Sequence, residues 1–98
     1  VATEAALHSQ KMARRQVSFG HAGFEDRVKR ISTRLGAVSA SGENVAQGVM
    51  TAADVVKQWL GSKVHRDNIE GRFNLTGVGI SRDTRGAIYY TQLFILKQ

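Results

Sequence analysis

The pattern of apolar and polar positions predicts three helices in the first two thirds of the chain. Residues 1–15 carry small apolar side chains at helical spacing, and residues 24–35 carry larger ones at i, i+4, i+7 and i+11. A third helix is predicted to begin at Thr51, because Asp54 completes a capping-box pattern, and to end at Gly61. Each helix has one apolar face, so each is expected to pack against another layer.

Strands are predicted in the rest of the chain. Residues 37–48 are rich in Ser and Gly and are interpreted as a loop leading into a short strand around 43–46. Residues 73–81 and 87–96 are predicted to be the two strands of a hairpin, preceded by a turn or a single helical turn at 65–71. The last strand is apolar on both faces near its end, which is typical of a central strand. The order of elements predicts an α+β fold, with a three-layer sandwich as one arrangement.

Composition narrows the class of protein. A chain of 98 residues forms one domain, and its hydrophobic fraction of 42% and charged fraction of 22% are those of an ordinary globule. No apolar run approaches the roughly 20 residues that a membrane-spanning helix needs. The chain has no cysteine, which excludes disulfides and thiolate metal ligands.

The net charge of +6 is compatible with binding to a polyanion but does not require it. Half of the 14 basic residues lie in the first two predicted helices, where they would either attract a polyanion or form a solvated helix face. No aromatic residues alternate with them, as a single-strand nucleic-acid site would need, so nucleic acid is not the favoured partner. These seven residues are Lys11, Arg14, Arg15, Arg27, Lys29, Arg30 and Arg34.

Three polar residues in predicted loops or at element edges form the candidate site: His21, Glu43 and His65. Two imidazoles and one carboxylate are a ligand set for zinc or another divalent cation, and the same groups suit general acid–base chemistry. The spacing has no HExxH pattern, so three unconnected polar residues are the alternative. The remaining histidine, His8, is interpreted as a partly buried helix residue bonded to the backbone.

Two further patterns carry weaker signals. Ser62 lies three residues before His65 and offers a nucleophile, although it lies outside any Gly-x-Ser-x-Gly elbow. The run Gly77-Val78-Gly79 has part of the composition of a phosphate loop, but it falls in a predicted strand with no following helix. Close strand packing or a bulge is the favoured interpretation of these glycines.

Short motifs in a fixed order give the chain a family resemblance. The most specific are a Gly-Glu-Asn segment, a tryptophan after it, and a His-Arg-x-Asn-Ile segment. Together with the other motifs, they resemble the bacterial, cysteine-free type of CAP (SCP) domain, the family of cysteine-rich secretory proteins, antigen 5 and plant pathogenesis-related proteins. The matching segments are His8-Ser9 with Met12-Ala13, Phe19-Gly20-His21, Arg27, Gly42-Glu43-Asn44-Val45-Ala46 with Gly48, Val56, Trp59-Leu60, Ser62, His65-Arg66, Asn68-Ile69, Gly77-Val78-Gly79, and Tyr90-Thr91-Gln92 with Phe94.

The resemblance implies a three-layer α-β-α sandwich with a central antiparallel sheet and a cleft lined by two histidines and two acidic residues. By motif, His21 and His65 match the cleft histidines and Glu43 the first glutamate, while Ser62 occupies the second acidic position. The opening helix of the family, with its Asn-x-x-Arg pattern, has no counterpart here. Residues 1–98 are therefore expected to form a single CAP domain that lacks the first helix.

The resemblance also implies a secreted or cell-envelope protein whose role is binding. We favour a binding module over an enzyme, because no residue is clearly placed as an activated nucleophile. Its cleft would hold a divalent cation such as zinc, or a small-molecule, lipid, protein or cell-wall ligand. The first alternative is a hydrolase acting on peptides, with Glu43 or a histidine as general base, or with a histidine that activates Ser62. The second alternative is polyanion binding through the basic helices.

Overall fold

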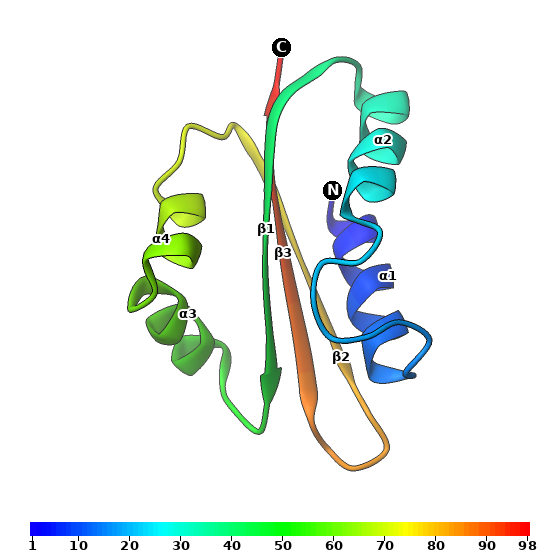
Figure 1. Cartoon of the computed structure of the whole chain (residues 1–98), viewed down its shortest axis with the longest axis vertical. Coiled ribbons are helices and arrows are strands. Elements are labelled where there is room, and N and C mark those ends of the chain that lie inside the picture. Colours follow the sequence, from blue (N-terminus) through cyan, green and yellow to red (C-terminus); the bar gives the residue numbers. More distant parts are fainter.

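A three-stranded antiparallel sheet forms the middle layer of the computed structural model, which describes residues 1–98 (Figure 1). The strands are β1 (Val38–Gly48), β2 (Leu75–Arg82) and β3 (Ile88–Lys97), and their order across the sheet is β1-β3-β2. The prediction that the last strand is central is confirmed. Both of its faces are buried because helices cover the sheet from both sides.

Two pairs of helices form the outer layers. On one side lie α1 (Ala2–Ala13) and α2 (Phe24–Leu35), and on the other lie α3 (Ala52–Leu60) and α4 (Lys63–Ile69) (Figure 1). The predicted three-layer sandwich is therefore confirmed. No helix is long and apolar enough to cross a membrane.

Local signals define the helix ends. Thr51 caps α3 as predicted: its side chain accepts a hydrogen bond from the Asp54 amide, and the Asp54 side chain accepts one from the Thr51 amide. Gly36 ends α2 with φ of 98°, a conformation that glycine adopts at little cost. The segment at 65–71, predicted to be a turn or a single helical turn, lies mostly in the seven-residue helix α4, which begins earlier, at Lys63.

The predicted loop before residue 43 is wrong. The segment is part of β1, an 11-residue strand whose register with β3 is continuous from Ala40 to Gly48. Its Ser and Gly residues have weak strand propensity, but pairing with the apolar β3 overrides that preference. Side chains along β1 therefore alternate between the two helical layers.

That alternation can be followed in the core. Val45 packs beneath α1 with Met12, Ala13 and Tyr89. The next residue, Ala46, packs beneath α3 in a second cluster with Val55, Trp59 and Tyr90. Glu43 has the parity of Val45, and Asn44 that of Ala46, so the two polar residues point into opposite layers.

The Gly-Val-Gly run of β2 allows close packing, and the element that approaches it is helix α1, not another strand. A Cβ atom built at Gly77 or Gly79 would collide with the α1 backbone at Ala2 or Ala6. The helix therefore lies directly on the strand, and Ser9 Oγ donates a 2.9 Å hydrogen bond to the Gly79 carbonyl. This contact places α1, and with it His8, over the sheet.

Candidate functional site

A buried carboxylate on β1 is the centre of the site. Glu43 is 6% exposed and Arg27 of α2 is 4% exposed. Arg27 Nε donates to Glu43 Oε2 at 2.8 Å, and Nη2 donates to Oε1 at 2.7 Å. Both carboxylate oxygens thus engage a planar guanidinium, the bidentate geometry that suits this pair of groups. The pairing compensates two charges that would be costly to bury separately.

The imidazole of His21 is attached to the same carboxylate from the outside. Its Nδ1 lies 2.9 Å from Glu43 Oε1, while about half of the side chain (52%) remains exposed. A carboxylate only accepts hydrogen bonds, so Nδ1 carries a proton, and in the neutral imidazole Nε2 keeps a free lone pair. The ring of His21 is therefore oriented by Glu43.

Arg27 also shapes the loop that carries His21. Its Nη1 donates to the Ala22 carbonyl at 2.7 Å, and Nη2 reaches the His21 carbonyl at 3.3 Å. Gly23 follows with φ of 80°, which lets the loop turn into α2. One buried arginine therefore positions both the carboxylate and the loop backbone of the exposed imidazole.

His8 lies behind this group and is 2% exposed. Its Nε2 lies 2.7 Å from the Gly20 carbonyl oxygen and, since a carbonyl can only accept, must be the donor. The interpretation of His8 as a backbone-bonded helix residue is confirmed. The same nitrogen is 4.0 Å from Glu43 Oε1, so His8 also closes the inner side of the site. Burial lowers its pKa, and Arg27 lowers it further, against the opposing effects of the Gly20 bond and Glu43.

His65 lies in the opposite helical layer, on α4. Its carbonyl accepts a 3.0 Å hydrogen bond from Asn44 Nδ2, and its ring lies 6.4 Å, centroid to centroid, from that of Trp59. The expected convergence of His65 with His21 and Glu43 is thus not found, because β1 separates them. No group of three His, Cys, Asp or Glu side chains is arranged to hold a metal ion.

The residues around His65 attach α4 and α3 to the open edge of β1. Asn68 Nδ2 donates to Asn44 Oδ1 at 2.9 Å and lies 3.3 Å from the Glu43 carbonyl, while Trp59 Nε1 donates to the Val45 carbonyl at 3.2 Å. These bonds satisfy carbonyl groups that an edge strand would otherwise expose. Gly42 is required beside them, since a Cβ there would collide with Asn68 Oδ1.

Ser62 also belongs to this layer. It is the residue that precedes α4, and its hydroxyl forms no capping hydrogen bond with that helix. Neither His21 nor His65 forms a hydrogen bond with it. The serine and the His21–Glu43 pair are therefore separate features of the molecule.

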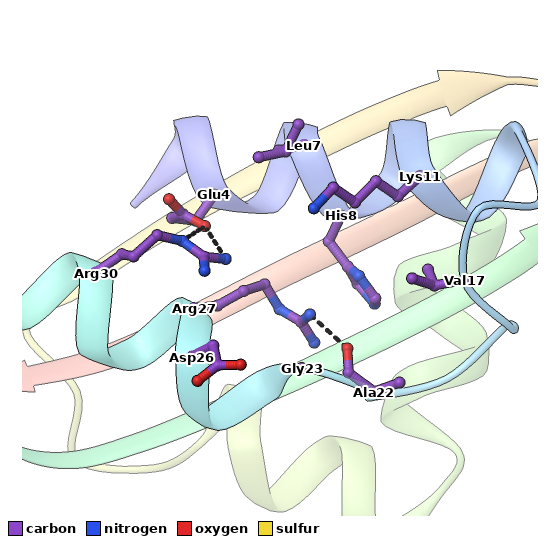
Figure 2. A pocket seen from close by; sticks show the side chains of 10 residues that line it. All are labelled: Glu4, Leu7, His8, Lys11, Val17, Ala22, Gly23, Asp26, Arg27 and Arg30. Carbon is purple, nitrogen blue, oxygen red and sulfur yellow. Dashed lines mark hydrogen bonds and ion pairs between the residues drawn. The ribbon is translucent and has the colours of Figure 1, made fainter.

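Two hollows border the His21–Glu43 pair. A small one of about 190 Å³ lies between α1 and α2, where His8 and Arg27 line it and the Glu4–Arg30 ion pair crosses one end (Figure 2). A shallower one of about 450 Å³ lies on the outer side, lined by His21, Gly23, Phe24, Glu25 and Asp26. The exposed imidazole therefore shares its surface hollow with two carboxylates.

Sequence reasoning missed Arg27 and His8 as members of the site. It grouped Arg27 with the basic residues that would either attract a polyanion or form a solvated helix face. Arg27, however, shares the apolar face of its helix with Phe24, Val28 and Ile31. A charged residue on an apolar helix face needs a buried partner, and that signal pointed to an acid elsewhere in the chain.

Comparison with known proteins assigns the family. The model of the cysteine-rich secretory protein family, CAP, matches residues 1–94. The chain belongs to the CAP family. A relative of this CAP domain is the uncharacterized protein YkwD of Bacillus subtilis, which is 44% identical over 57 residues. That match covers 58% of this chain and about a fifth (21%) of the relative's length.

Solved structures agree with the fold of the CAP domain. An extracellular protein containing an SCP domain from Bacillus anthracis superposes with a TM-score of 0.79 at 29% identity, covering 98% of this chain and 31% of that one. An outer surface protein from Borrelia burgdorferi superposes with a TM-score of 0.80 at 17% identity, covering 98% of this chain and 72% of that one. The latter likeness concerns the fold alone.

Proposed function

We propose that this CAP domain is an extracellular binding module that takes a cationic group of its ligand beside His21. The supporting observation is the pairing of His21 with Glu43, which leaves Nε2 as a hydrogen-bond acceptor at the surface. A structural neighbour described as an extracellular protein supports the location.

The chemistry around Nε2 favours a cation. The outer hollow adds the carboxylates of Glu25 and Asp26, neither of which forms an ion pair within the chain. An ammonium or guanidinium group would donate to Nε2 and be attracted by both acids. Phe24 lines the same hollow and offers apolar contact to the carbon chain of such a group.

The donor set does not fit the three-ligand zinc site expected from the sequence. Zinc sites in proteins use at least three side-chain ligands. Here Glu43 accepts from Arg27 with both oxygens, and His65 lies beyond β1, which leaves one imidazole nitrogen at the surface. We expect a divalent cation to bind weakly, through His21 and the charge of the neighbouring acids.

A hydrolase with His21 as general base is the second candidate. The carboxylate that orients its imidazole supports it, since an oriented base with a free nitrogen is what activation of water requires. Purified protein should then cleave members of a peptide library, and His21→Ala should abolish the cleavage. Absence of cleavage with and without zinc would leave the binding module as the sole candidate.

Titration followed by NMR tests the binding module directly. Methylammonium and a lysine-containing peptide are added to labelled protein, and amide shifts are expected to concentrate in residues 21–26. His21→Ala and the double change Glu25→Gln with Asp26→Asn should each weaken binding about tenfold or more, since each removes a charge-assisted contact.

His65→Ala is the matched control, because it removes an imidazole from the opposite layer. His65→Ala should leave the amide shifts and the affinity in the titration unchanged. Both histidine variants, His21→Ala and His65→Ala, should remain folded. Equal loss in the two histidine variants would contradict the proposal, and so would shifts centred on α4.

A further inference from the structure

One end of the sheet gathers exposed arginines from two parts of the chain, the end of α1 and the β2–β3 hairpin. In the strand register, Gly48 of β1 lies opposite Ile88 of β3, which lies opposite Arg82 of β2. The loop after β1 and the hairpin between β2 and β3 therefore leave the sheet at the same end. The C-terminus of α1 reaches that end as well, at the lower side of the molecule (Figure 1).

The end of α1 and the hairpin enclose a hollow of about 360 Å³. Arg14 and Arg15 line it from the helix, and Thr84 and Arg85 line it from the hairpin. Arg14, Arg15, Arg82 and Arg85, here called the arginine end, are all exposed, and none of them forms an ion pair. The four guanidinium groups are therefore free to meet an external anion.

The acids at this end are engaged with the backbone. Asp83 Oδ1 accepts hydrogen bonds from the amides of Arg85 and Ala87, both at 2.9 Å, and shapes the hairpin. Asp54 completes the capping box of α3. Four arginines against two acids leave the surface positive, and guanidinium groups recognise phosphate oxygens in bidentate fashion.

An apolar side chain projects beside this basic surface. Val49, in the loop that follows β1, is 86% exposed, the highest value among the large apolar residues of the chain. A hydrophilic polymer offers no apolar region in which the Val49 side chain could be buried. The boundary between the headgroups and the acyl chains of a lipid layer offers such a region.

We propose that the arginine end and Val49 dock this domain on the surface of an anionic phospholipid bilayer. The molecule measures 40 × 28 × 16 Å, and the arginine end lies at one end of its longest axis. The domain would stand on the bilayer by a small footprint, with the His21 hollow on its side and accessible. Attraction of basic side chains to anionic lipid supplies the affinity, and Val49 distinguishes a bilayer from a soluble polyanion.

Co-sedimentation with vesicles tests the proposal. Vesicles of phosphatidylglycerol mixed with phosphatidylcholine should bind the domain, less so at high salt, and vesicles of phosphatidylcholine alone should not. The triple variant Arg14→Gln, Arg15→Gln, Arg85→Gln should lower the partition coefficient roughly 100-fold, at about fivefold for each basic residue near the surface. Val49→Ser should lower it a few-fold.

A control of equal charge separates this surface from net charge. Lys29→Gln, Arg34→Gln, Lys97→Gln also removes three positive charges, so both triple variants fall from +6 to +3. These three residues are exposed and lie outside the arginine end. An equal loss of vesicle binding in the two triple variants would overturn the proposal. So would vesicle binding by the Arg14, Arg15 and Arg85 triple variant that is as tight as that of the unchanged protein.

Val49→Trp reports insertion directly. Brominated lipid should quench the new tryptophan, while the native Trp59, which is 3% exposed, serves as an internal reference for folding. Absence of quenching, with heparin bound as tightly as the vesicles, would assign the arginines to a soluble polyanion and overturn docking on a bilayer.

Discussion

The two faces of β1 carry opposite kinds of polar group at adjacent residues. On the face beneath α1 and α2, Glu43 holds a charged cluster with Arg27 and His21. On the face beneath α3 and α4, Asn44 holds a neutral cluster with Asn68 and the backbone of His65. One face leaves an imidazole nitrogen exposed to solvent, and the other attaches a helix pair to an open strand edge.

The difference shows that one short motif serves two separate purposes. The Gly-Glu-Asn segment places a buried ion pair and an amide clamp only one residue apart, because consecutive strand residues face opposite layers. Glu43 belongs with the candidate binding site, and Asn44 with the assembly of the sandwich. His65 is grouped with His21 by motif, yet its observed contacts are those of the clamp.

Arg27→Ala breaks the charged face and should have the largest effect. It leaves the buried Glu43 carboxylate without its partner, which costs about 3–5 kcal/mol of unfolding free energy. The loop carbonyls of His21 and Ala22 lose donors as well. Urea denaturation followed by Trp59 fluorescence gives the measurement.

A double variant shows whether the cost is the unpaired charge. Arg27→Met with Glu43→Leu removes both charges at similar volume and should recover much of the loss, as replacements of buried ion pairs often do. A double variant as unstable as Arg27→Ala would mean that the bonds to the loop carbonyls dominate instead. The variant should also lose the oriented His21, and with it ligand binding.

Asn44→Ala breaks the neutral face and should cost less, about 1–3 kcal/mol. The substitution leaves the His65 carbonyl without its donor and deprives Asn68 of one acceptor, but no charge is left buried. Hydrogen exchange should show opening of α3 and α4 with α1 and α2 still protected. Loss of protection spread evenly over both helical layers would contradict the assignment of this face to the clamp.

Local signals determine the parts of the fold that could be predicted from the sequence. The apolar face of α2, the capping box at Thr51 and the close-packed glycines of β2 all follow from patterns within a few residues. The length of β1 does not, because its strand identity comes from pairing with β3 across about 50 residues of sequence. Non-local pairing leaves little trace in a Ser- and Gly-rich segment.

The candidate site, like the fold, could be predicted only in part from the sequence. The loop glycines and family motifs indicated His21 and Glu43, which do meet. The sides of β1 on which Glu43 and His65 lie depend on strand parity, and parity cannot be assigned to residue 43 without the strand that precedes it. A count of net charge treats every basic side chain as solvated, so it does not reveal that Arg27 is buried.

Substitution of His8 should have the smallest effect on stability. It tests the charged face of β1 through the dependence of stability on pH. Burial lowers its pKa in the folded chain below the unfolded value of 6.5, so in the window below pH 6.5 the unfolded chain binds more protons. Its contribution to stability is therefore present above pH 6.5 and is lost as the pH falls through the folded pKa. The Gly20 bond and Glu43 oppose the shift and so reduce its effect on stability. His8→Gln should flatten the stability profile in this window, measured by urea midpoints from about pH 5 to pH 8. A slope in His8→Gln equal to that of the unchanged protein would show that His8, and with it the charged face of β1, has no part in the pH response.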